Sequence, residues 1–334
     1  MYENVRVAVV IPAYNEENHV GTVIETVPAF VDVVYVIDDS SVDGTWAEIE
    51  RHATHVVDET DLEHDLAPWA EEGPRPVVAM RHESNRGRGR CIKDGYRRAL
   101  ADGIDVVAVM DGDGQMDPAE LHRIIDPIAK GRADYSKGTR LQDRSHVRGM
   151  SKFRLFGNLL LSLLTNLSSG YWGMLDSQNG YTAISRRALE TIPIETLYDG
   201  YGFLNDLLTT LNVHGLRLVE VSHPAVYDDE ESGISYATFI PSVSLLLLQN
   251  FLFRLQQRYV VKEFHATIVC YGVGSLGLLT GIANLAATLV TGSIVPVTGL
   301  STPVLLVTGL VVFLLAIALD VQQNSDLTER IDST

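Results

Sequence analysis

This 334-residue sequence contains little cysteine and lysine, and its basic residues are outnumbered by acidic ones. Its two cysteines, Cys91 in an expected soluble segment and Cys270 in an apolar one, exclude a framework of disulfides. Only five residues are lysine, and 43 acidic residues against 26 basic ones give a net charge of −17. Nucleic-acid binding requires clustered positive charge, so we expect no nucleic-acid partner. Low lysine and high acidity favour a halophilic source, with an ordinary acidic protein as the alternative.

Charge is absent altogether between residues 264 and 319, which contain no Asp, Glu, Lys or Arg. A helix that crosses a bilayer needs roughly 20 apolar residues, so this stretch is too long for one crossing and fits two. We expect spans at Ala266–Val290 and Pro303–Leu319, joined by a turn at Thr291–Thr302 that is rich in Gly, Ser, Thr and Pro. A transmembrane hairpin therefore tethers the rest of the chain to a bilayer.

The sequence also shows no signal-peptide pattern, because Met1–Arg6 leads directly into an apolar run of strand length. Arg254, Arg258 and Lys262 precede the first expected span, whereas the turn between the spans has no Lys or Arg. The positive-inside rule then predicts a multi-pass protein of the cell membrane, with the front domain and both termini in the cytoplasm.

The front half of the chain alternates strand and helix patterns. Apolar runs of strand length lie at Arg6–Ile11, Val31–Ile37, Pro76–Met80 and Val106–Met110. Helical periodicity lies between and after them, at Glu17–Val27, Thr45–His52, Gly89–Leu100 and Pro118–Ala129. Runs that are apolar throughout are typical of parallel strands covered on both faces. The sequence therefore predicts a doubly wound α/β domain, with the acidic stretch Asp58–Arg75 as a surface insertion.

Two more apolar stretches precede the hairpin. Leu155–Leu175 is long enough to cross a membrane, but it contains Asn158 and Asn166, and a crossing there would place later polar motifs on the opposite side. We expect a helix at the membrane surface, with a third crossing as the alternative. Phe239–Phe253 is too short to span, so we expect a second interfacial helix that leads the three basic residues after it to the headgroups.

Polar loops follow the predicted strands, and ligands of parallel sheets bind beyond the carboxyl ends of the strands. Asp111 and Asp113 follow the fourth strand, where two carboxylates two residues apart can face one Mg²⁺ or Mn²⁺ ion. Gln115 can add an amide oxygen. A polar turn without a ligand is the alternative. An EF-hand is disfavoured because His122 occupies the twelfth position, where that loop requires an acid.

Acids also follow the second strand. Asp38 and Asp39 can hydrogen-bond a nucleotide base or ribose, while Asp43 suits the start of the next helix as well. We expect both roles in this loop, with Asp43 acting partly as a helix cap.

Two basic clusters could contact phosphate, although a solvated helix face is the alternative for part of the first. The first cluster, around a Gly-rich turn, comprises Arg86, Arg88, Arg90, Arg97 and Arg98. The second, beside the expected interfacial helix, comprises Arg140, Arg144, Arg148, Lys152 and Arg154. A basic cluster beside an interfacial helix suits a phosphate at the level of the headgroups.

Four motifs follow one another along the front domain: Pro12-Ala13-Tyr14-Asn15-Glu16, Asp38-Asp39-Ser40 with Asp43-Gly44-Thr45, Asn85-x-Gly87-x-Gly89, and Asp111-x-Asp113-x-Gln115. In this order they resemble the inverting family-2 glycosyltransferases with a GT-A fold, a Rossmann-like, mostly parallel α/β fold. Within that family the chain is similar to the polyprenyl- and dolichyl-phosphate mannosyl- or glucosyltransferases, over roughly residues 5 to 230 and in its C-terminal hairpin. Together with the composition, the resemblance suggests a haloarchaeal member.

The resemblance implies roles for individual residues. The nucleotide sugar would be bound by Pro12, Ala13, Tyr14, Glu16, Asp38, Asp39, Asn85 and Arg88. Mg²⁺ or Mn²⁺ would be held by Asp111, Asp113 and Gln115. The acceptor phosphate would be bound by Arg140, Arg148, Ser151, Lys152, Arg154 and Gln178. Catalytic carboxylates would be Asp111, Asp113, Asp176 and Asp206. Arg88 departs from the usual Lys, and acidic residues occupy 228–231 where a basic residue is common.

The activity implied by the resemblance is metal-dependent, inverting transfer of a hexose from a UDP- or GDP-sugar to a membrane dolichyl or polyprenyl phosphate, for N-glycosylation or surface glycan assembly. The alternatives are transfer to a lipid-linked oligosaccharide or polysaccharide, and an inactive, membrane-anchored nucleotide-binding scaffold. We expect a catalytic domain at 1–232 with an interfacial helix at 153–175, juxtamembrane helices at 233–263, transmembrane helices at 264–320 and a cytoplasmic tail at 321–334. The sequence fixes neither the sugar nor the oligomeric state.

Overall fold

The structure is a computed structural model that describes residues 2–57, 75–141, 152–200, 202–224, 236–291 and 300–331, with the backbone alone at 152–156, 236–240 and 291. The strands in these ranges are β1 (Val7–Ala13), β2 (Val33–Asp38), β3 (His55–Val57), β4 (Val77–Arg81), β5 (Val106–Val109), β6 (Tyr135–Thr139), β7 (Thr182–Ser185), β8 (Leu218–Ser222) and β9 (Thr328–Ile331). Within the described residues they form one nine-stranded sheet in the order β3-β4-β2-β1-β5-β7-β6-β8-β9.

Pairing in this sheet is mostly parallel. Strand β1 pairs in parallel with β2 and β5, β4 with β2 and β3, and β8 with β6 and β9, whereas β7 is antiparallel to β5 and β6. Every residue of β1 and β2 is buried, as their unbroken apolar runs require. This confirms the predicted, mostly parallel α/β sheet. The four predicted strands lie within two residues of their expected ends.

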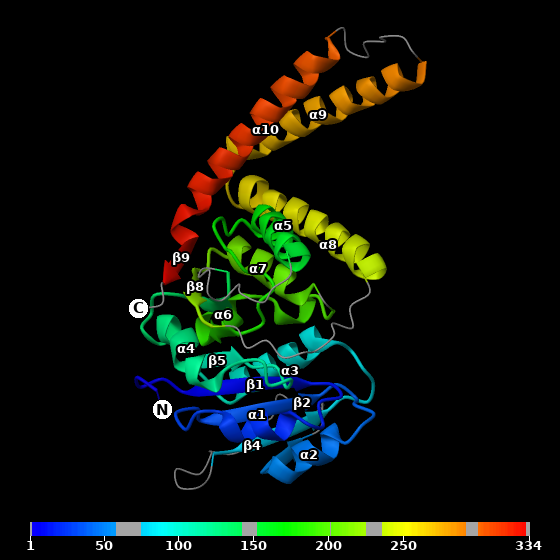
Figure 1. Ribbon diagram of the computed structural model, residues 1–334. Coiled ribbons are helices and arrows are strands. Elements are labelled where there is room, and N and C mark those ends of the chain that lie inside the picture. Colours follow the sequence, from blue (N-terminus) through cyan, green and yellow to red (C-terminus); the bar gives the residue numbers. More distant parts are fainter. Residues whose placement is uncertain are drawn as a thin grey trace.

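Helices cover both faces of the sheet (Figure 1). They are α1 (Val20–Thr26), α2 (Thr45–His52), α3 (Arg88–Ala101), α4 (Leu121–Ala129), α5 (Lys152–Ser169), α6 (Arg186–Thr191), α7 (Phe203–Val213), α8 (Tyr236–Gln256), α9 (Ala266–Thr291) and α10 (Thr302–Asn324). Short 3-10 helices occupy Pro118–Glu120, Ile194–Thr196 and Ser325–Leu327, and a π-helical turn occupies Gln257–Lys262. The four helices predicted in the front half are all present, with α1 and α4 each beginning three residues later than expected.

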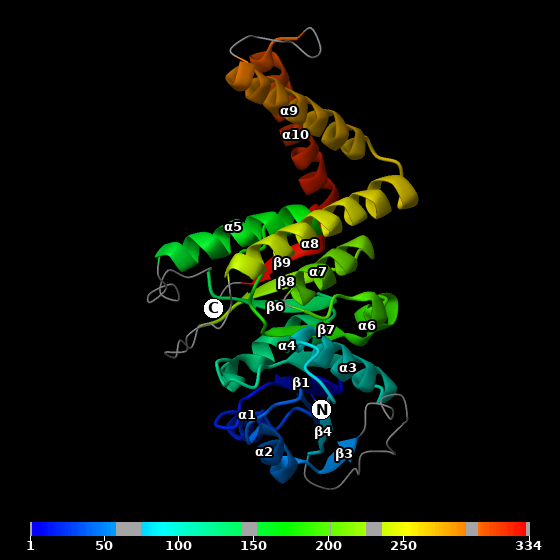
Figure 2. The same cartoon turned by 90° about the vertical axis from the view of Figure 1, so that its right-hand side faces the viewer.

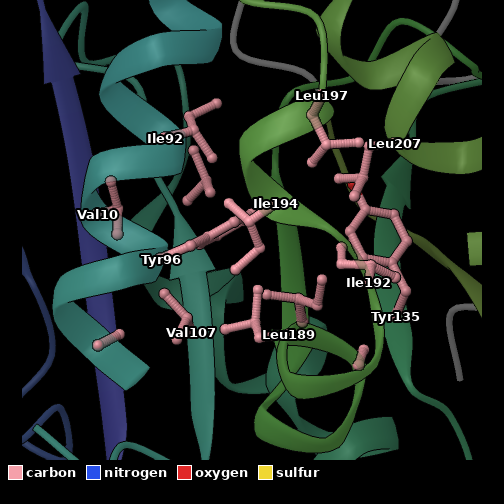
Figure 3. Close-up of a cluster of buried hydrophobic side chains, with 14 of the residues drawn as sticks. Val10, Ile92, Tyr96, Val107, Tyr135, Leu189, Ile192, Ile194, Leu197 and Leu207 are labelled. Carbon is pink, nitrogen blue, oxygen red and sulfur yellow. The ribbon is translucent and has the colours of Figure 1, made fainter. Parts of the chain in front are cut away.

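Two apolar clusters form the core, one on each face of the sheet. The alternation of side chains along β1 places Val10 in one cluster and Val9 in the other. Figure 3 shows Val10 and Val107 of the sheet facing Ile92 and Tyr96 of α3, all four fully or almost fully buried. The core therefore fixes the strands and α3, whose ends carry the polar loops.

Helices α5 and α8 lie side by side between the sheet domain and the hairpin (Figures 1 and 2). Polar residues of α5 face the domain: Thr165 donates to Asn205 (3.0 Å), and Asn166 donates to the carbonyl of Met174 (2.9 Å). The helix ends at Ser169, before Gly170, whose backbone lies in the left-handed region (φ 80°). Residues 170–175, which we expected to continue the helix, are therefore not helical. One face of α5 therefore packs on the domain, and the place of this helix at a membrane surface stays a prediction.

Two helices among the described residues are long and apolar enough to cross a membrane, at Ala266–Val290 and Thr302–Leu327. They are the two C-terminal helices predicted from the charge-free stretch. Small residues bring α9 and α10 together: a Cβ on Gly277 would lie 3.0 Å from the Cα of Gly309. The turn expected at Thr291–Thr302 lies mostly outside the described residues, as does the stretch Asp58–Arg75.

After α10 the chain returns to the sheet. Residues Thr328–Ile331 form β9, which pairs in parallel with β8 at the edge of the sheet (Figure 1). The segment 321–334, expected to be only a tail, therefore contributes a strand to the front domain. Such a short, largely polar strand carries no apolar alternation by which it could be recognised in the sequence.

Candidate active site

Loops at the carboxyl ends of β1, β2 and β5 are joined by backbone hydrogen bonds. The N–H of Asp39 donates to the carbonyl of Ala13 (2.9 Å), and the N–H of Gly112 donates to that of Pro12 (3.1 Å). A Cβ on Gly112 would lie 3.2 Å from the same Pro12 oxygen, so the loop after β5 approaches β1 as closely as it does because residue 112 is glycine. This edge of the sheet holds the first, second and fourth polar loops together.

A pocket of about 220 Å³ opens at this edge. Its lining residues are Pro12, Ala13, Tyr14, Glu16, Asp39, Arg88, Cys91, Asp111, Gly112 and Asp113. Most residues expected to bind the nucleotide sugar, together with both Asp-x-Asp carboxylates, thus meet in one cavity.

Three of the residues expected to bind the nucleotide sugar or the metal ion lie outside the lining of this pocket. Asp38 is buried and pairs with the Nε of Arg81 (3.0 Å), and its burial raises the pKa of its carboxyl. Asn85 is exposed in the loop before α3. Gln115 donates its backbone N–H to Asp113 Oδ1 (3.0 Å), which fixes the turn that carries Asp113.

Asp111 and Asp113 offer hard oxygen donors at the pocket, the chemistry that Mg²⁺ and Mn²⁺ require. Arg88 Nε donates to Asp111 Oδ1 (2.6 Å). A Cβ on Gly180 would lie 3.0 Å from Asp111 Oδ2 and 2.5 Å from Arg88 Nη2, so Gly180 leaves room for this pair. The donor set fits a divalent cation.

A second group of donor atoms lies beside the pocket, where atoms of Asp39, His82 and Cys91 are within 4.8 Å of one another. His82 Nδ1 is 2.7 Å from Asp39 Oδ1, and Nε2 is 3.1 Å from Asp94 Oδ2. Burial lowers the pKa of His82, but its hydrogen bonds to the two carboxylates outweigh burial and raise the pKa to about 11. Burial raises the pKa of the Cys91 thiol. Metals bind neutral imidazole and thiolate, so we interpret this group as a hydrogen-bonded cluster.

That cluster orients Asp39. Its Oδ1 accepts the backbone N–H of Arg86 (2.9 Å), and its Oδ2 accepts that of Gly87 (2.7 Å). Burial raises the pKa of the Asp39 carboxyl, but the hydrogen bond from His82 and these two backbone bonds hold it below its usual value. Asp39 therefore faces the pocket as an ionised hydrogen-bond acceptor.

On the expected acceptor side, Arg140 and Asp176 form a bidentate ion pair. Arg140 Nε is 2.8 Å from Asp176 Oδ2, and Nη2 is 3.2 Å from Oδ1. Gln178 donates to the hydroxyl of Ser177 (2.9 Å). Arg144, Arg148 and Ser151 lie outside the described residues, as do the side chains of Lys152 and Arg154 at the start of α5.

Asp206, expected as a catalytic carboxylate, lies in the first turn of α7. It accepts the backbone N–H of Tyr198 (2.8 Å), and burial raises the pKa of its carboxyl. It does not belong to the lining of the described pocket. The geometry gives Asp206 a role in holding the 198–200 loop, whose Asp199 carbonyl lies against Gly87 and Gly89.

Most of the first basic cluster is paired with acids away from the pocket. Arg90 donates to Asp94 (2.8 Å), Arg98 to Asp102 (2.7 Å), and Arg97 is 3.0 Å from Glu195. The pairs to Asp94 and Asp102 have i,i+4 spacing, a signal present in the sequence.

The sequence did not reveal the roles of His82 and Cys91. His82 directly follows β4 and Cys91 lies in the first turn of α3, and neither belongs to a recognisable motif.

Comparison with known proteins identifies the relatives of this chain. Residues 8–192 match the family model described as Glycosyl transferase family 2. The UDP-N-acetylglucosamine–dolichyl-phosphate N-acetylglucosaminyltransferase of Methanococcus voltae is 28% identical over 66% of this chain and 85% of its own length. The polyprenol monophosphomannose synthase of Mycolicibacterium smegmatis is 31% identical over 69% of this chain and 80% of its own.

The fold is also shared with a solved structure. A glucosyl-3-phosphoglycerate synthase of Mycobacterium tuberculosis, solved with Mn²⁺, UDP-glucose and phosphoglyceric acid, superposes with a TM-score of 0.52 at 22% identity. The match covers 75% of this chain and 80% of that one. At this identity the likeness concerns the fold.

Proposed function

The chain belongs to glycosyl transferase family 2, and on that premise we propose that it transfers a sugar from a nucleotide sugar to a polyprenyl or dolichyl phosphate in the membrane. The observation that carries the proposal is one pocket that joins Asp39 with Asp111 and Asp113, in a chain with two C-terminal helices that could span a bilayer. The two relatives compared above are named as a dolichyl-phosphate and a polyprenol-phosphate sugar transferase, which supports a lipid phosphate as acceptor.

In this proposal the nucleotide lies against the β1 and β2 loops. Asp39, as an ionised acceptor, suits a base that offers an N–H, a property that uracil and guanine share. Asp111 and Asp113 would hold Mg²⁺ or Mn²⁺, which when bound neutralises charge on the pyrophosphate. Arg88 adds a fixed positive charge beside Asp111. The chain thus provides separate groups for the base and for the diphosphate.

The proposed transfer reaction does not require a strong general base. An oxygen of the lipid phosphate forms the new bond to the anomeric carbon, while the bond to the nucleoside diphosphate breaks and its electron pair leaves with the diphosphate. In-line attack inverts the anomeric centre. A phosphate monoester is largely ionised near pH 7, so its oxygen is already nucleophilic. We therefore assign Asp176 to orienting Arg140 and Asp206 to holding the 198–200 loop.

The acceptor phosphate would meet Arg140, with Arg148, Ser151, Lys152, Arg154 and Gln178 as further proposed contacts. Exposed leucines on the neighbouring helices support a site at the membrane surface: Leu159, Leu160, Leu163 and Leu164 on α5, and Leu245, Leu248 and Leu252 on α8. We propose a cytoplasmic catalytic domain at 1–232 followed by interfacial and transmembrane helices, and a haloarchaeal source in view of the acidic composition.

The test uses the purified full-length protein in detergent with dolichyl phosphate and labelled UDP-N-acetylglucosamine, UDP-glucose or GDP-mannose. We expect label in the organic phase with one donor, abolished by EDTA and restored by Mg²⁺ or Mn²⁺. Asp113→Asn should lose about 100-fold or more in rate, because stabilising the leaving diphosphate contributes several kcal/mol.

The matched control is Glu50→Gln, an exposed carboxylate on α2, which should retain activity. Transfer to a lipid-linked oligosaccharide but never to dolichyl phosphate would favour the alternative acceptor. Metal-independent transfer, or full activity of Asp113→Asn, would contradict the assigned role of Asp113.

A further inference from the structure

Three charged side chains lie in one row across β6, β8 and β9, the last three strands in the order of the sheet. The strand register pairs Lys137 of β6 with Glu220 of β8, and Glu220 with Arg330 of β9. Partners in register project to the same face of a sheet. The side chains of Lys137 and Glu220 are fully buried, whereas that of Arg330 is 40% exposed and its Nε lies 3.8 Å from Glu220 Oε2.

Glu220 holds the backbone of the neighbouring loop. Its carboxylate accepts the N–H of Leu175 (2.9 Å) and the N–H of Asp176 (3.2 Å). The guanidinium of Arg330 lies over the same loop, because a Cβ on Gly173 would be 3.2 Å from Arg330 Nη2. Arg330 therefore lies beside both the Glu220 carboxylate and the loop whose backbone this carboxylate holds.

The loop in turn orients Arg140. Asp176 forms the bidentate pair with Arg140 described above, and the backbone N–H of Arg140 also donates to Asp176 Oδ2 (3.2 Å). Lys137 is buried beside this segment, where its Nζ donates to the carbonyl of Asn179 (2.6 Å). Burial lowers the pKa of Lys137 to about 8, and the charges of Asp176 and Glu220 oppose that shift.

Charges thus alternate from the C-terminal strand to the acceptor side: Arg330, Glu220, Lys137, Asp176 and Arg140. A buried carboxylate is costly unless its charge is compensated. Burial raises the pKa of Glu220, and the backbone hydrogen bonds from Leu175 and Asp176 and the charge of Lys137 oppose that rise. Removing Arg330 would leave Glu220 with Lys137 as its remaining cation in the row and would open it to water.

We propose that Arg330, which the chain brings back from the membrane hairpin, is a positioning residue for the acceptor phosphate: through Glu220 and the 175–176 backbone it sets the orientation of Arg140. The inference rests on the proposed function, in which Arg140 meets that phosphate. It also gives the hairpin a second role, because the strand that carries Arg330 follows α10 after a single short 3-10 helix (Figure 1). The position of the membrane segment and the geometry of the acceptor site are then linked through one short strand.

The experiment compares Arg330→Ala, Arg330→Lys and the control Glu329→Ala in the full-length protein. Glu329 is the exposed neighbour on β9, in register with Val219 rather than Glu220. For Arg330→Ala we expect the KM for dolichyl phosphate to rise about threefold to thirtyfold, with the KM for the donor unchanged. Arg330→Lys should recover part of the loss, because it restores the charge but not the planar fork.

Hydrogen exchange supplies a readout that does not depend on turnover. Amides at 175–176 should exchange faster in Arg330→Ala than in Glu329→Ala at equal thermal stability, since the bonds to Glu220 would be weakened. An unchanged KM for dolichyl phosphate together with unchanged exchange at 175–176 would overturn the inference. If the wild-type protein transfers no sugar to dolichyl phosphate, the proposed function fails, while the exchange comparison still tests the link from Arg330 to the loop.

Discussion

At the scale of single residues, His82 has its charge state set by two acids from different elements. Asp39 comes from the loop after β2 and Asp94 from α3, and Asp94 is itself bound by Arg90 (2.8 Å) and 3.6 Å from Arg97. The thiol of Cys91 lies 3.9 Å from His82 Nδ1. With a carboxylate at each nitrogen, the imidazole is stable in its doubly protonated form. Protonation of His82 is therefore part of the folded state.

This charge predicts how stability depends on pH. The pKa of His82 rises from an ordinary 6.5 to about 11 in the folded protein, so its stabilising effect is complete below about pH 6.5 and disappears as the pH rises towards 11. We expect His82→Gln to lower the melting temperature most at pH 6, and the difference from wild type to shrink at pH 8 and again at pH 10.

His19→Gln is the matched control, because His19 is exposed before α1 and its side chain makes no capping bond there. It should leave the melting temperature within error at each pH, as measured by tryptophan fluorescence. A difference between wild type and His82→Gln that stays constant from pH 6 to pH 10 would show that the imidazole is not charged.

The carboxylates of the pocket could be predicted from the sequence, whereas their supporting partners could not. Asp39, Asp111 and Asp113 follow apolar strands, and the carboxyl ends of parallel strands meet at one edge. The partners of Asp39 are 43 to 48 positions away along the chain, at His82, Arg86 and Gly87. Such contacts depend on how α3 packs on the sheet, which no local spacing encodes.

At the scale of elements, α5 and α8 each divide their residues between two environments. On α5, Ser162 and Thr165 are buried against the domain, while Leu160 and Leu163 are 45% and 58% exposed. On α8, Leu248 is 53% exposed. The polar residues within the first apolar stretch and the short length of the second favoured surface helices over crossings, and the burial of polar residues of α5 against the domain supports that interpretation. The sequence could not show where α5 ends, because 170–175 remain apolar beyond Gly170.

Substituting this apolar face should affect transfer at a bilayer. Placing one exposed Leu in lipid contributes about 1.5–3 kcal/mol, so we expect Leu163→Glu with Leu248→Glu to slow transfer to dolichyl phosphate in vesicles at least about tenfold. The hairpin should still retain the protein in the vesicle fraction. The assay measures labelled lipid formed per retained protein.

Val56→Glu provides the control, since Val56 is an exposed apolar residue on β3, at the opposite edge of the sheet (Figure 2). It should retain the wild-type rate. Equal losses in Val56→Glu and the double variant, or an unchanged rate in the double variant, would mean that α5 and α8 do not dock on lipid.

At the scale of the whole molecule, the charge-free stretch predicted the two long apolar C-terminal helices, but not how they are joined to the domain. The joint is a buried ion pair: Arg254 of α8 donates to Asp320 of α10 at 2.8 and 2.7 Å, and both side chains are fully buried. Arg254 also donates to the carbonyls of Leu167 and Ser168 in α5. Asp320 ends a long apolar run, and only the folded chain shows that its partner lies 66 residues earlier.

Around this pair, further polar groups leave Asp320 fully compensated. The hydroxyls of Tyr259 and Tyr271 and the amide of Asn324 donate to its carboxylate, and Asn324 is linked to Asn212 of α7 (3.0 Å). One acid therefore connects α7, α8, α9 and α10. A buried carboxylate is costly unless its charge is compensated, as that of Asp320 is here.

The strongest test of this joint is a double-mutant cycle. Removing one partner of a buried ion pair leaves an uncompensated charge and costs about 3–5 kcal/mol, whereas replacing both by apolar residues is often neutral. We expect Asp320→Leu and Arg254→Met each to lower the melting temperature sharply and to expose the chain around 262–266 to protease. The combined variant should recover most of both losses, because the charges vanish together. Additive losses in the double variant would mean that Arg254 and Asp320 act through separate contacts, and that the hairpin is joined to the domain mainly through β9.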